Sequence, residues 1–251
     1  FEYAFNSCGS LATIGSGVLL GTANETATVN FQNTFYNSGL TALPAGLNLS
    51  QGSNFAQTFH SCSSLTTIGS GVLLGTASTS VDFGSAFQSS GLTELPANLD
   101  LSQGSAFNSA FESCTSLTTI GSGVLLGTAN ATAPVDFSSV FRGTAITELP
   151  AGLDMSQGDS FEAAFYNCAS LATIGSGVLL GTASSNVNFG YAFYNTALTE
   201  LPAGLDMSQG DTFLGAFLSC SSLTTIGSGV LLGTASTNVA FTSAFYGSAL
   251  T

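Results

Sequence analysis

The chain has 251 residues, of which 44% are hydrophobic and 6% are charged, and its formal net charge is −13. A surface of this sign repels nucleic acid and anionic membranes, which argues against both as partners. No apolar run approaches the ~18 residues that a membrane span needs. No Lys is present, which excludes a Walker-type phosphate loop and a Schiff base.

Every Phe belongs to a pair of the form F-x-x-x-F, and the 20 Phe make ten such pairs, from Phe1 and Phe5 to Phe241 and Phe245. The step from pair to pair alternates between a long interval of 28 or 30 residues and a short one of 24. A fixed period of this length is typical of a solenoid, in which each coil contacts only its neighbours. We therefore predict a single continuous solenoid of ten coils over residues 1–251. Because both ends fall inside a coil motif, we expect it to be a window of a longer array.

Each coil opens with a segment that predicts a short helix. In F-N-S-A-F-E-S-C, which begins at Phe107, the apolar or small side chains fall at i, i+3, i+4 and i+7, which is one face of a helix. Asn or Asp stands directly before the first Phe of four short coils, where a helix N-cap belongs. These candidate caps are Asn30, Asp82, Asp136 and Asn188.

A short strand is predicted after each helix, because the motif L-T-x-(I/L) is followed by Gly or Pro. In long coils it leads into I-G-S-G-V-L-L-G-T-A, which occurs five times unchanged, and in short coils into L-P-A-(G/N)-L, which occurs four times. The G-x-G-x-x-x-G pattern recurs in every long coil, which favours a turn at a strand end over a nucleotide-binding loop. The expected fold class is an α/β repeat, a leucine-rich-repeat-like solenoid with one short helix and one short parallel strand per coil.

The strand motif C-x-x-L-T-x-I and the helix motif A-F-x-x-C together resemble the BspA-type leucine-rich repeat and the closely similar repeat of bacterial surface lipoproteins. The resemblance extends over all ten coils. It implies a leucine-rich-repeat solenoid on a cell surface that serves in adhesion and attachment. The chain differs from that family in its alternating coil length and in its near-absence of basic residues.

Five Cys occupy one column of the repeat, seven positions after the first Phe of each long coil, and the short coils place Ser or Thr there. No C-x-x-C spacing occurs, so a thiolate metal site is not expected. Successive Cys lie two coils apart, beyond the ~7 Å that a disulfide allows, and a buried Cys behaves as a small apolar side chain. We therefore predict unpaired, buried thiols at Cys8, Cys62, Cys114, Cys168 and Cys220.

The position directly after the second Phe of each pair is variable, and we expect it to be exposed. His60 and Arg142 stand in this column, and neither is assigned a catalytic role, because the neighbouring coils supply no partner. Four Tyr share the column, and exposed aromatic side chains are typical of contact surfaces. The candidates for lateral contacts on the helical side are Tyr36, Tyr166, Tyr194 and Tyr246.

Carboxylates form further columns in the short coils. In three of these coils Glu takes a strand position at which long coils carry Thr, so the strand face should alternate Thr and Glu. An Asp follows the L-P-A turn in the same coils, and in two of them a second Asp stands five residues later. Oxygen-rich loops can bind Ca²⁺, although no complete calcium loop is present and Asp is also a common turn residue. These carboxylates are Glu94, Glu148 and Glu200, Asp100, Asp154 and Asp206, and the second Asp residues Asp159 and Asp211.

No acid–base pair and no nucleophile–base pair converges, so no catalytic, cofactor-binding or metal-binding residue is predicted, and an enzyme is the least favoured class. The expected function is structural: an extracellular or cell-surface repeat protein that serves as a filament subunit or an adhesin stalk, with self-association or end-to-end continuation of the array. The alternative is a ligand-binding module that holds calcium or glycan on its Thr/Glu strand face. Ice binding is a remote third option, because Glu interrupts the Thr array that it needs.

Overall fold

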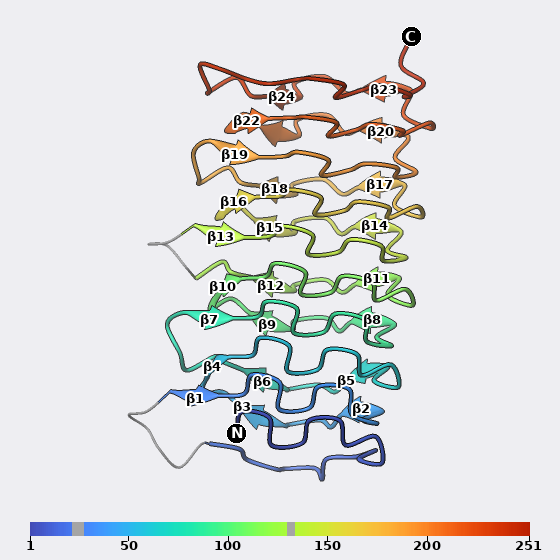
Figure 1. The fold of residues 1–251 in the computed structure, drawn as a ribbon. Helices are drawn as coiled ribbons and strands as arrows, with labels where there is room; N and C mark the ends of the chain where they lie inside the picture. The colour runs from blue at the N-terminus through green and yellow to red at the C-terminus, as the bar shows by residue number, and fades with distance from the viewer. Residues whose placement is uncertain (22–27, 130–133) are drawn as a thin grey trace.

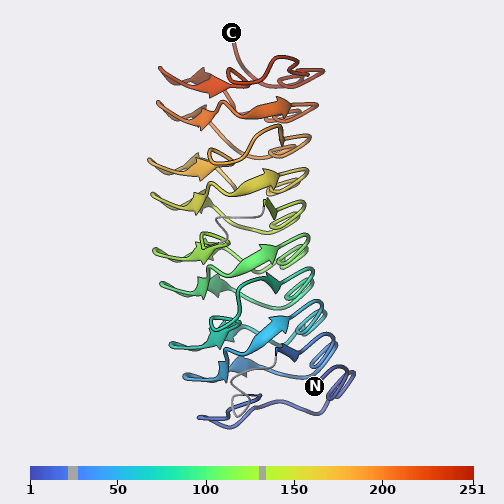
Figure 2. The same cartoon turned by 90° about the vertical axis from the view of Figure 1, so that its left-hand side faces the viewer.

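The computed structural model describes residues 1–21, 28–129 and 134–251. In these ranges the chain forms short strands joined by turns, and no helix is present, so none that could span a membrane is found there. Successive turns stack from the N-terminus to the C-terminus (Figure 1) and keep the same orientation along the stack (Figure 2). The fold is therefore a parallel β-solenoid, and the predicted α/β repeat with helices is wrong.

One long parallel sheet runs along the solenoid, and within the described residues eight turns each contribute a strand to it (Figure 1). The predicted count of ten coils is wrong, because the ninth interval adds only an isolated bridge between Thr212 and Ala240, and the tenth holds only residues 241–251. The strands of this sheet are, in order, β1 (Val29–Asn30), β4 (Gly52–Asn54), β7 (Val81–Asp82), β10 (Gly104–Ala106), β13 (Val135–Asp136), β16 (Gly158–Ser160), β19 (Val187–Asn188) and β22 (Gly210–Thr212).

Two further strand positions form two-stranded parallel sheets, each of which joins a short turn to the long turn that follows it. The strand expected at the motif L-T-x-(I/L) is found at the first of these positions. The pairs there are β2 (Ala42–Leu43) with β5 (Thr67–Ile68), β8 (Glu94–Leu95) with β11 (Thr119–Ile120), β14 (Glu148–Leu149) with β17 (Thr173–Ile174), and β20 (Glu200–Leu201) with β23 (Thr225–Ile226). The pairs at the second position are β3 (Asn48–Leu49) with β6 (Leu73–Leu74), β9 (Asp100–Leu101) with β12 (Leu125–Leu126), β15 (Asp154–Met155) with β18 (Leu179–Leu180), and β21 (Asp206–Met207) with β24 (Leu231–Leu232).

The segments that were expected to be helices are series of tight turns. The residue two positions after each Phe, such as Asn33 with a φ of 54°, lies in the left-handed region, which a right-handed helix does not allow. The Thr34 amide donates to the Phe31 carbonyl at 3.0 Å, which closes a four-residue turn. The Phe35 amide then donates to the Thr58 carbonyl of the next turn at 3.0 Å. In a run of four-residue turns, the side chains at i and i+4 point into the solenoid, as they would on one face of a helix. The apolar pattern of the sequence is therefore compatible with both structures.

The close spacing of the turns excludes helices. Phe rings of successive turns stack nearly parallel in two ladders along the solenoid, with centroids 4.9–5.8 Å apart. Packed helices need axes about 8–10 Å apart, whereas neighbouring strands lie only about 4.8 Å apart. Interior rings such as Phe111 have no exposed surface, and the ladders form the centre of the hydrophobic core.

The residues expected to be helix N-caps form turns at the ends of strands in the long sheet. The Oδ1 of Asp82 accepts a hydrogen bond from the Gly84 amide at 2.7 Å, which is an Asx turn. This turn leads the chain from the strand into the tight turns that carry the Phe pair. In each of these residues the side-chain Oδ1 accepts a hydrogen bond from the amide two positions later. The predicted helix-capping role is therefore wrong for Asn30, Asp82, Asp136 and Asn188.

Candidate functional site

One side of the solenoid is divided into pairs of turns. Each short turn is joined to the next long turn: the Gly69 amide donates to the Leu43 carbonyl at 2.8 Å, and the Leu73 amide donates to the Leu47 carbonyl at 2.9 Å. On this side the strands β5 and β6 of that long turn pair only with β2 and β3, and not with β8 and β9 of the short turn that follows. A groove therefore lies between β5–β6 and β8–β9.

Proline helps to keep this groove open. The Leu95 carbonyl accepts a hydrogen bond from the Gly121 amide of the following turn at 2.8 Å. Because backbone groups alternate in direction along a strand, the next residue, Pro96, faces the preceding turn across the groove. Proline has no N–H, so it cannot donate a ladder hydrogen bond there. The equivalent residues of the other short turns are Pro44, Pro150 and Pro202.

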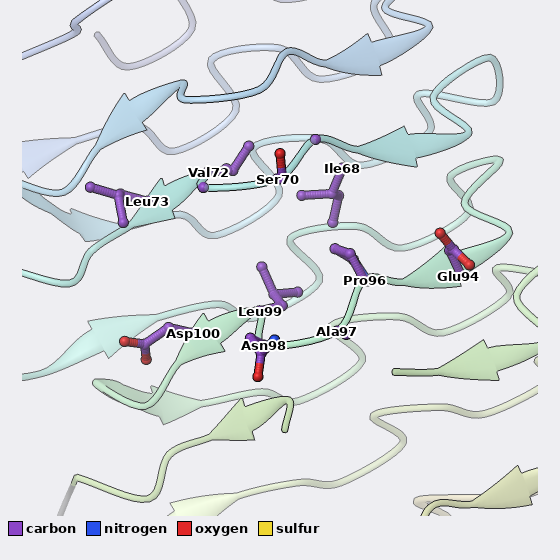
Figure 3. A pocket seen from close by; sticks show the side chains of 12 residues that line it. Ile68, Ser70, Val72, Leu73, Glu94, Pro96, Ala97, Asn98, Leu99 and Asp100 are labelled. Carbon is purple, nitrogen blue, oxygen red and sulfur yellow. The ribbon is translucent and has the colours of Figure 1, made fainter. Parts of the chain in front are cut away.

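The groove encloses about 560 Å³ (Figure 3). Its floor is apolar, because Ile68, Val72 and Leu99 line it and are each only 5% exposed. Glu94 lies at one end of the groove and Asp100 at the other (Figure 3). The site therefore combines an apolar floor with a carboxylate at each end.

A smaller hollow of about 70 Å³ lies at the equivalent place between β18 and β21, and its lining includes Val178, Pro202 and Asp206. Large apolar side chains also stand at the outer edge of this side, each 37–40% exposed: Leu73, Leu125, Leu179 and Leu231. The sequence interpretation missed the grooves and these leucines, because it treated the string that contains V-L-L as a turn at a strand end. The signal that could have found them is a single repeat column in which the long turns carry an exposed Leu and the short turns carry Asp, as in the pair Leu125 and Asp100.

The two carboxylate columns follow this side of the solenoid. Glu94 is exposed and pairs in register with Thr119, so the predicted alternation of Thr and Glu is found on this face. Asp100 is half-buried, and its Oδ1 accepts a hydrogen bond from the Ser102 amide at 2.9 Å, so it acts as a turn residue, the alternative to calcium binding given above. Equivalent bonds hold Asp154 and Asp206.

The second Asp of each candidate calcium loop stands on another element. Asp159 and Asp211 lie in β16 and β22 of the long sheet, whereas the first Asp residues lie in β15 and β21. Burial raises the pKa of Asp159, and the charge of Asp136 adds to the rise. In the part of the chain that the structure describes, no group of three or more His, Cys, Asp or Glu side chains could hold a metal ion. The calcium alternative stays a prediction from loop composition.

The column after the second Phe forms a ladder whose side chains contact one another. Tyr36 stacks on His60 with ring centroids 4.9 Å apart, and Tyr166 stacks on Tyr194 at 4.4 Å. These four side chains are half-buried rather than fully exposed as predicted, whereas Tyr246 is 75% exposed. The ladder therefore offers outward ring edges and hydroxyls more than ring faces.

The two basic side chains of this column contact their neighbours in the same ladder. The Arg142 guanidinium lies 4.9 Å from the centroid of the Tyr166 ring and 3.8 Å from the Glu112 carboxylate. Burial lowers the pKa of His60, and its Nδ1 lies 2.8 Å from the Ser61 hydroxyl. Both residues thus take part in packing along the column.

The predicted thiol column is buried and hydrogen-bonded. The Cys168 thiol donates to the Phe141 carbonyl at 3.0 Å and lies 3.3 Å from the Thr144 hydroxyl. Equivalent contacts hold Cys62, Cys114 and Cys220. All five Cys are free, as predicted, but Cys8 is exposed. Burial raises the pKa of the four interior thiols, to about 11 for Cys168.

We expect iodoacetamide at mildly alkaline pH to label Cys8 alone in the folded protein and all five Cys after unfolding in denaturant. The thiolate is the reactive form, and a raised pKa together with burial keeps the interior thiols protonated and out of reach. Mass spectrometry of the alkylated chain counts and locates the labels. Fast labelling of Cys114 or Cys168 in the folded protein would contradict the burial of this column.

No protein-family model and no curated protein matches the chain. Among solved structures, a leucine-rich repeat protein from Bacteroides ovatus ATCC 8483 aligns with 76% of this chain and 74% of its own, at 13% sequence identity and a TM-score of 0.20. An alignment at this level carries no argument about fold or function. The repeat solenoid is shown by the structure itself, and the resemblance to BspA-type repeats is not confirmed.

Proposed function

We propose that the chain is a non-catalytic structural or interaction module of a repeat protein, which acts as a filament subunit or an adhesin stalk. The observation that carries this proposal is the pair of Phe ladders. The same ring-on-ring contact joins neighbouring turns along the solenoid, with interior examples at Phe83, Phe107 and Phe137. Such an array gains stability from each nearest-neighbour interface and suits a stiff spacer or scaffold.

Self-association through the Tyr column belongs to the same proposal. Tyr246 is the most exposed Tyr of the column, at 75%. Tyr36, Tyr166 and Tyr194 would contribute ring edges and hydroxyl groups, because their faces contact other rings of the ladder. Tyrosine in this arrangement is suited to mixed apolar and hydrogen-bonding contacts.

The alternative function is the binding of calcium or glycan on the Thr/Glu strand face. The exposed carboxylate of Glu94 beside Thr119 favours it, because these groups supply oxygen ligands and hydrogen-bond acceptors. Against it, the hydroxyl of the adjacent exposed residue, Thr118, donates to the Thr93 carbonyl at 3.2 Å, so that donor is used within the solenoid and not by a ligand.

Thermal melts separate the two functions. A scaffold should give the same Tm in millimolar calcium chloride and in EDTA, whereas a calcium site filled at a hundred times its Kd would add about 2.7 kcal/mol of stability. Electron microscopy of the same sample should show extended particles. A clear rise in Tm with calcium would favour the ligand-binding alternative and contradict the scaffold proposal.

We place the protein outside the cell or on its surface as part of the same proposal. The support is the resemblance of its motifs to surface repeats. Antibodies against the folded chain should then label intact cells of the source organism. Labelling that requires permeabilised cells would contradict this placement.

A further inference from the structure

We propose that the grooves between long and short turns bind an extended basic segment of a partner protein, with one Lys or Arg side chain in each groove. The proposal rests on the interaction-module function and names the chemistry of its partner. It is carried by the make-up of the groove, by the charge of the chain and by the spacing of the grooves.

The groove fits a long side chain that is apolar along its stem and cationic at its end. The floor formed by Ile68, Val72 and Leu99 can cover an aliphatic stem, and the carboxylates of Glu94 and Asp100 stand at the two ends. Lys and Arg bury their methylene groups along apolar surface while the charged group stays in water or meets a carboxylate. The net charge of −13 adds a long-range attraction for a basic partner.

A second copy of this chain cannot supply the occupant. The chain has no Lys, and its single Arg, Arg142, lies over Tyr166 and beside Glu112 in the column of the Phe turns. Residues 1–251 of a second copy therefore do not supply the basic segment, and the proposed self-association uses other surfaces such as the Tyr column.

The spacing of the grooves selects an extended segment. Long and short turns alternate, so equivalent positions recur every two turns, about 10 Å along the solenoid axis at the usual strand spacing. A polyproline II helix advances about 3.1 Å per residue, so three residues cover about 9 Å, and its three residues per turn place every third side chain on the same side. A polyproline II segment with Lys or Arg at every third position can thus reach successive grooves, whereas a β-strand turns residues i and i+3 to opposite faces. The carboxylates on this two-turn repeat are Glu94, Glu148 and Glu200 with Asp100, Asp154 and Asp206.

The first short turn differs from the others at this place. It carries Ala42 and Asn48 where the later short turns carry Glu and Asp, and Asn48 forms a parallel bridge with Leu19 of the preceding turn. This backbone contact closes the groove at the first short turn, where the carboxylates are absent, although Pro44 stands at the position equivalent to Pro96. The groove lined by Glu94 and Asp100 and the smaller hollow lined by Asp206 both lie at short turns that carry the carboxylates, which is the arrangement that a basic ligand needs.

The test uses fluorescein-labelled peptides with four Lys spaced every second, third or fourth residue, separated by Ser and Ala, in fluorescence anisotropy titrations at physiological salt. The peptide with Lys at every third position should bind about tenfold more tightly than the other two. Equal affinity for the three spacings would overturn the proposal, because it would show only non-specific attraction to an acidic protein. Absence of binding by all three peptides would overturn it as well.

Charge-matched variants locate the binding site. The triple variant Glu94→Gln, Glu148→Gln, Glu200→Gln should weaken the third-position peptide about tenfold, as expected for three exposed ion pairs of modest strength.

The control variant Asp82→Asn, Asp136→Asn, Asp211→Asn removes the same charge from the long sheet and should change the affinity less than twofold. Asn occupies the column of Asp82 and Asp136 naturally at Asn30 and Asn188, and uncharged Ser occupies the column of Asp211 at Ser53 and Ser105, so the control variant should fold. Equal weakening by both variants would overturn the groove as the site. The melts in calcium and EDTA involve no peptide, so these failures would leave the scaffold proposal standing.

Discussion

Replacing Phe111 by Ala should lower the free energy of unfolding by about 3–5 kcal/mol, the usual cost of removing a large ring from a packed core. Phe111 has no exposed surface, and its ring stacks on Phe87 and on Phe141 with both centroid distances at 5.4 Å. Its removal opens a cavity in the middle of a ladder, and neither neighbouring ring can close it without breaking its own stacking. Urea denaturation followed by circular dichroism measures the loss.

The matched comparison is Arg142→Ala, on the outside of the adjacent turn. Its side chain is 48% exposed, and its contacts with Glu112 and Tyr166 lie near water, so the loss should not exceed about 1 kcal/mol. If Arg142→Ala destabilised the protein more than Phe111→Ala, the inward orientation of the Phe pairs would be wrong.

The change Gly121→Ala should destabilise the protein by about 1–3 kcal/mol, as overpacking does in a tight interior. A Cβ at this position would lie 2.5 Å from the Ala97 nitrogen and 2.7 Å from the Leu95 carbonyl oxygen. Both are backbone atoms of the neighbouring short turn, and they cannot move away without disturbing the β8–β11 pairing. The same denaturation experiment measures the change in free energy of unfolding.

Gly15→Ala is the control, because Gly15 occupies the same position in the first long turn. There a Cβ would meet only the Val18 Cγ2 atom at 3.6 Å, which is an ordinary contact. The control should leave the stability within about 0.5 kcal/mol of the starting protein. An equal loss for Gly15→Ala and Gly121→Ala would show that the effect comes from the glycine backbone and not from the approach of the neighbouring turn.

The sequence was sufficient to predict the solenoid, the inward Phe pairs and the thiol column. Each of these depends on a period that repeats many times, and an error in one copy is corrected by the others. The strand at Thr67–Ile68 was also predictable, because its motif has the expected residue types and stops at Gly69.

The helices were wrongly predicted because residues 107–114 satisfy both a helix and a run of four-residue turns. The distance between coils decides between the two structures, and the sequence does not state that distance. Residues such as Ser109 and Ser113, with φ of 56° and 59°, gave little warning, since Ser is not a typical left-handed residue. The stacked Phe rings provide the close contact that favours the turns.

The groove was not predictable from local patterns, because it depends on which neighbouring turns pair. Glu94 and Asp100 were recognised as columns, but their position at the two ends of one hollow follows from the missing pairing beside Pro96. A proline in a strand motif was interpreted only as the end of the strand. Its second effect, the loss of a donor toward the preceding turn, needed the register of the sheet.

The stacking of each turn on a near copy of itself has a consequence for how the gene can change. Phe107 and Phe161 both begin long turns and both follow a short turn, after Ala106 and Ser160. Loss of residues 107–160 would place Phe161 after Ala106, and the new junction would again set ring against ring and thiol near hydroxyl. Unequal recombination can thus add or remove a pair of turns, and the new contact between turns is of a kind that already occurs elsewhere in the solenoid. The length of the molecule becomes a trait that selection can adjust independently of its packing.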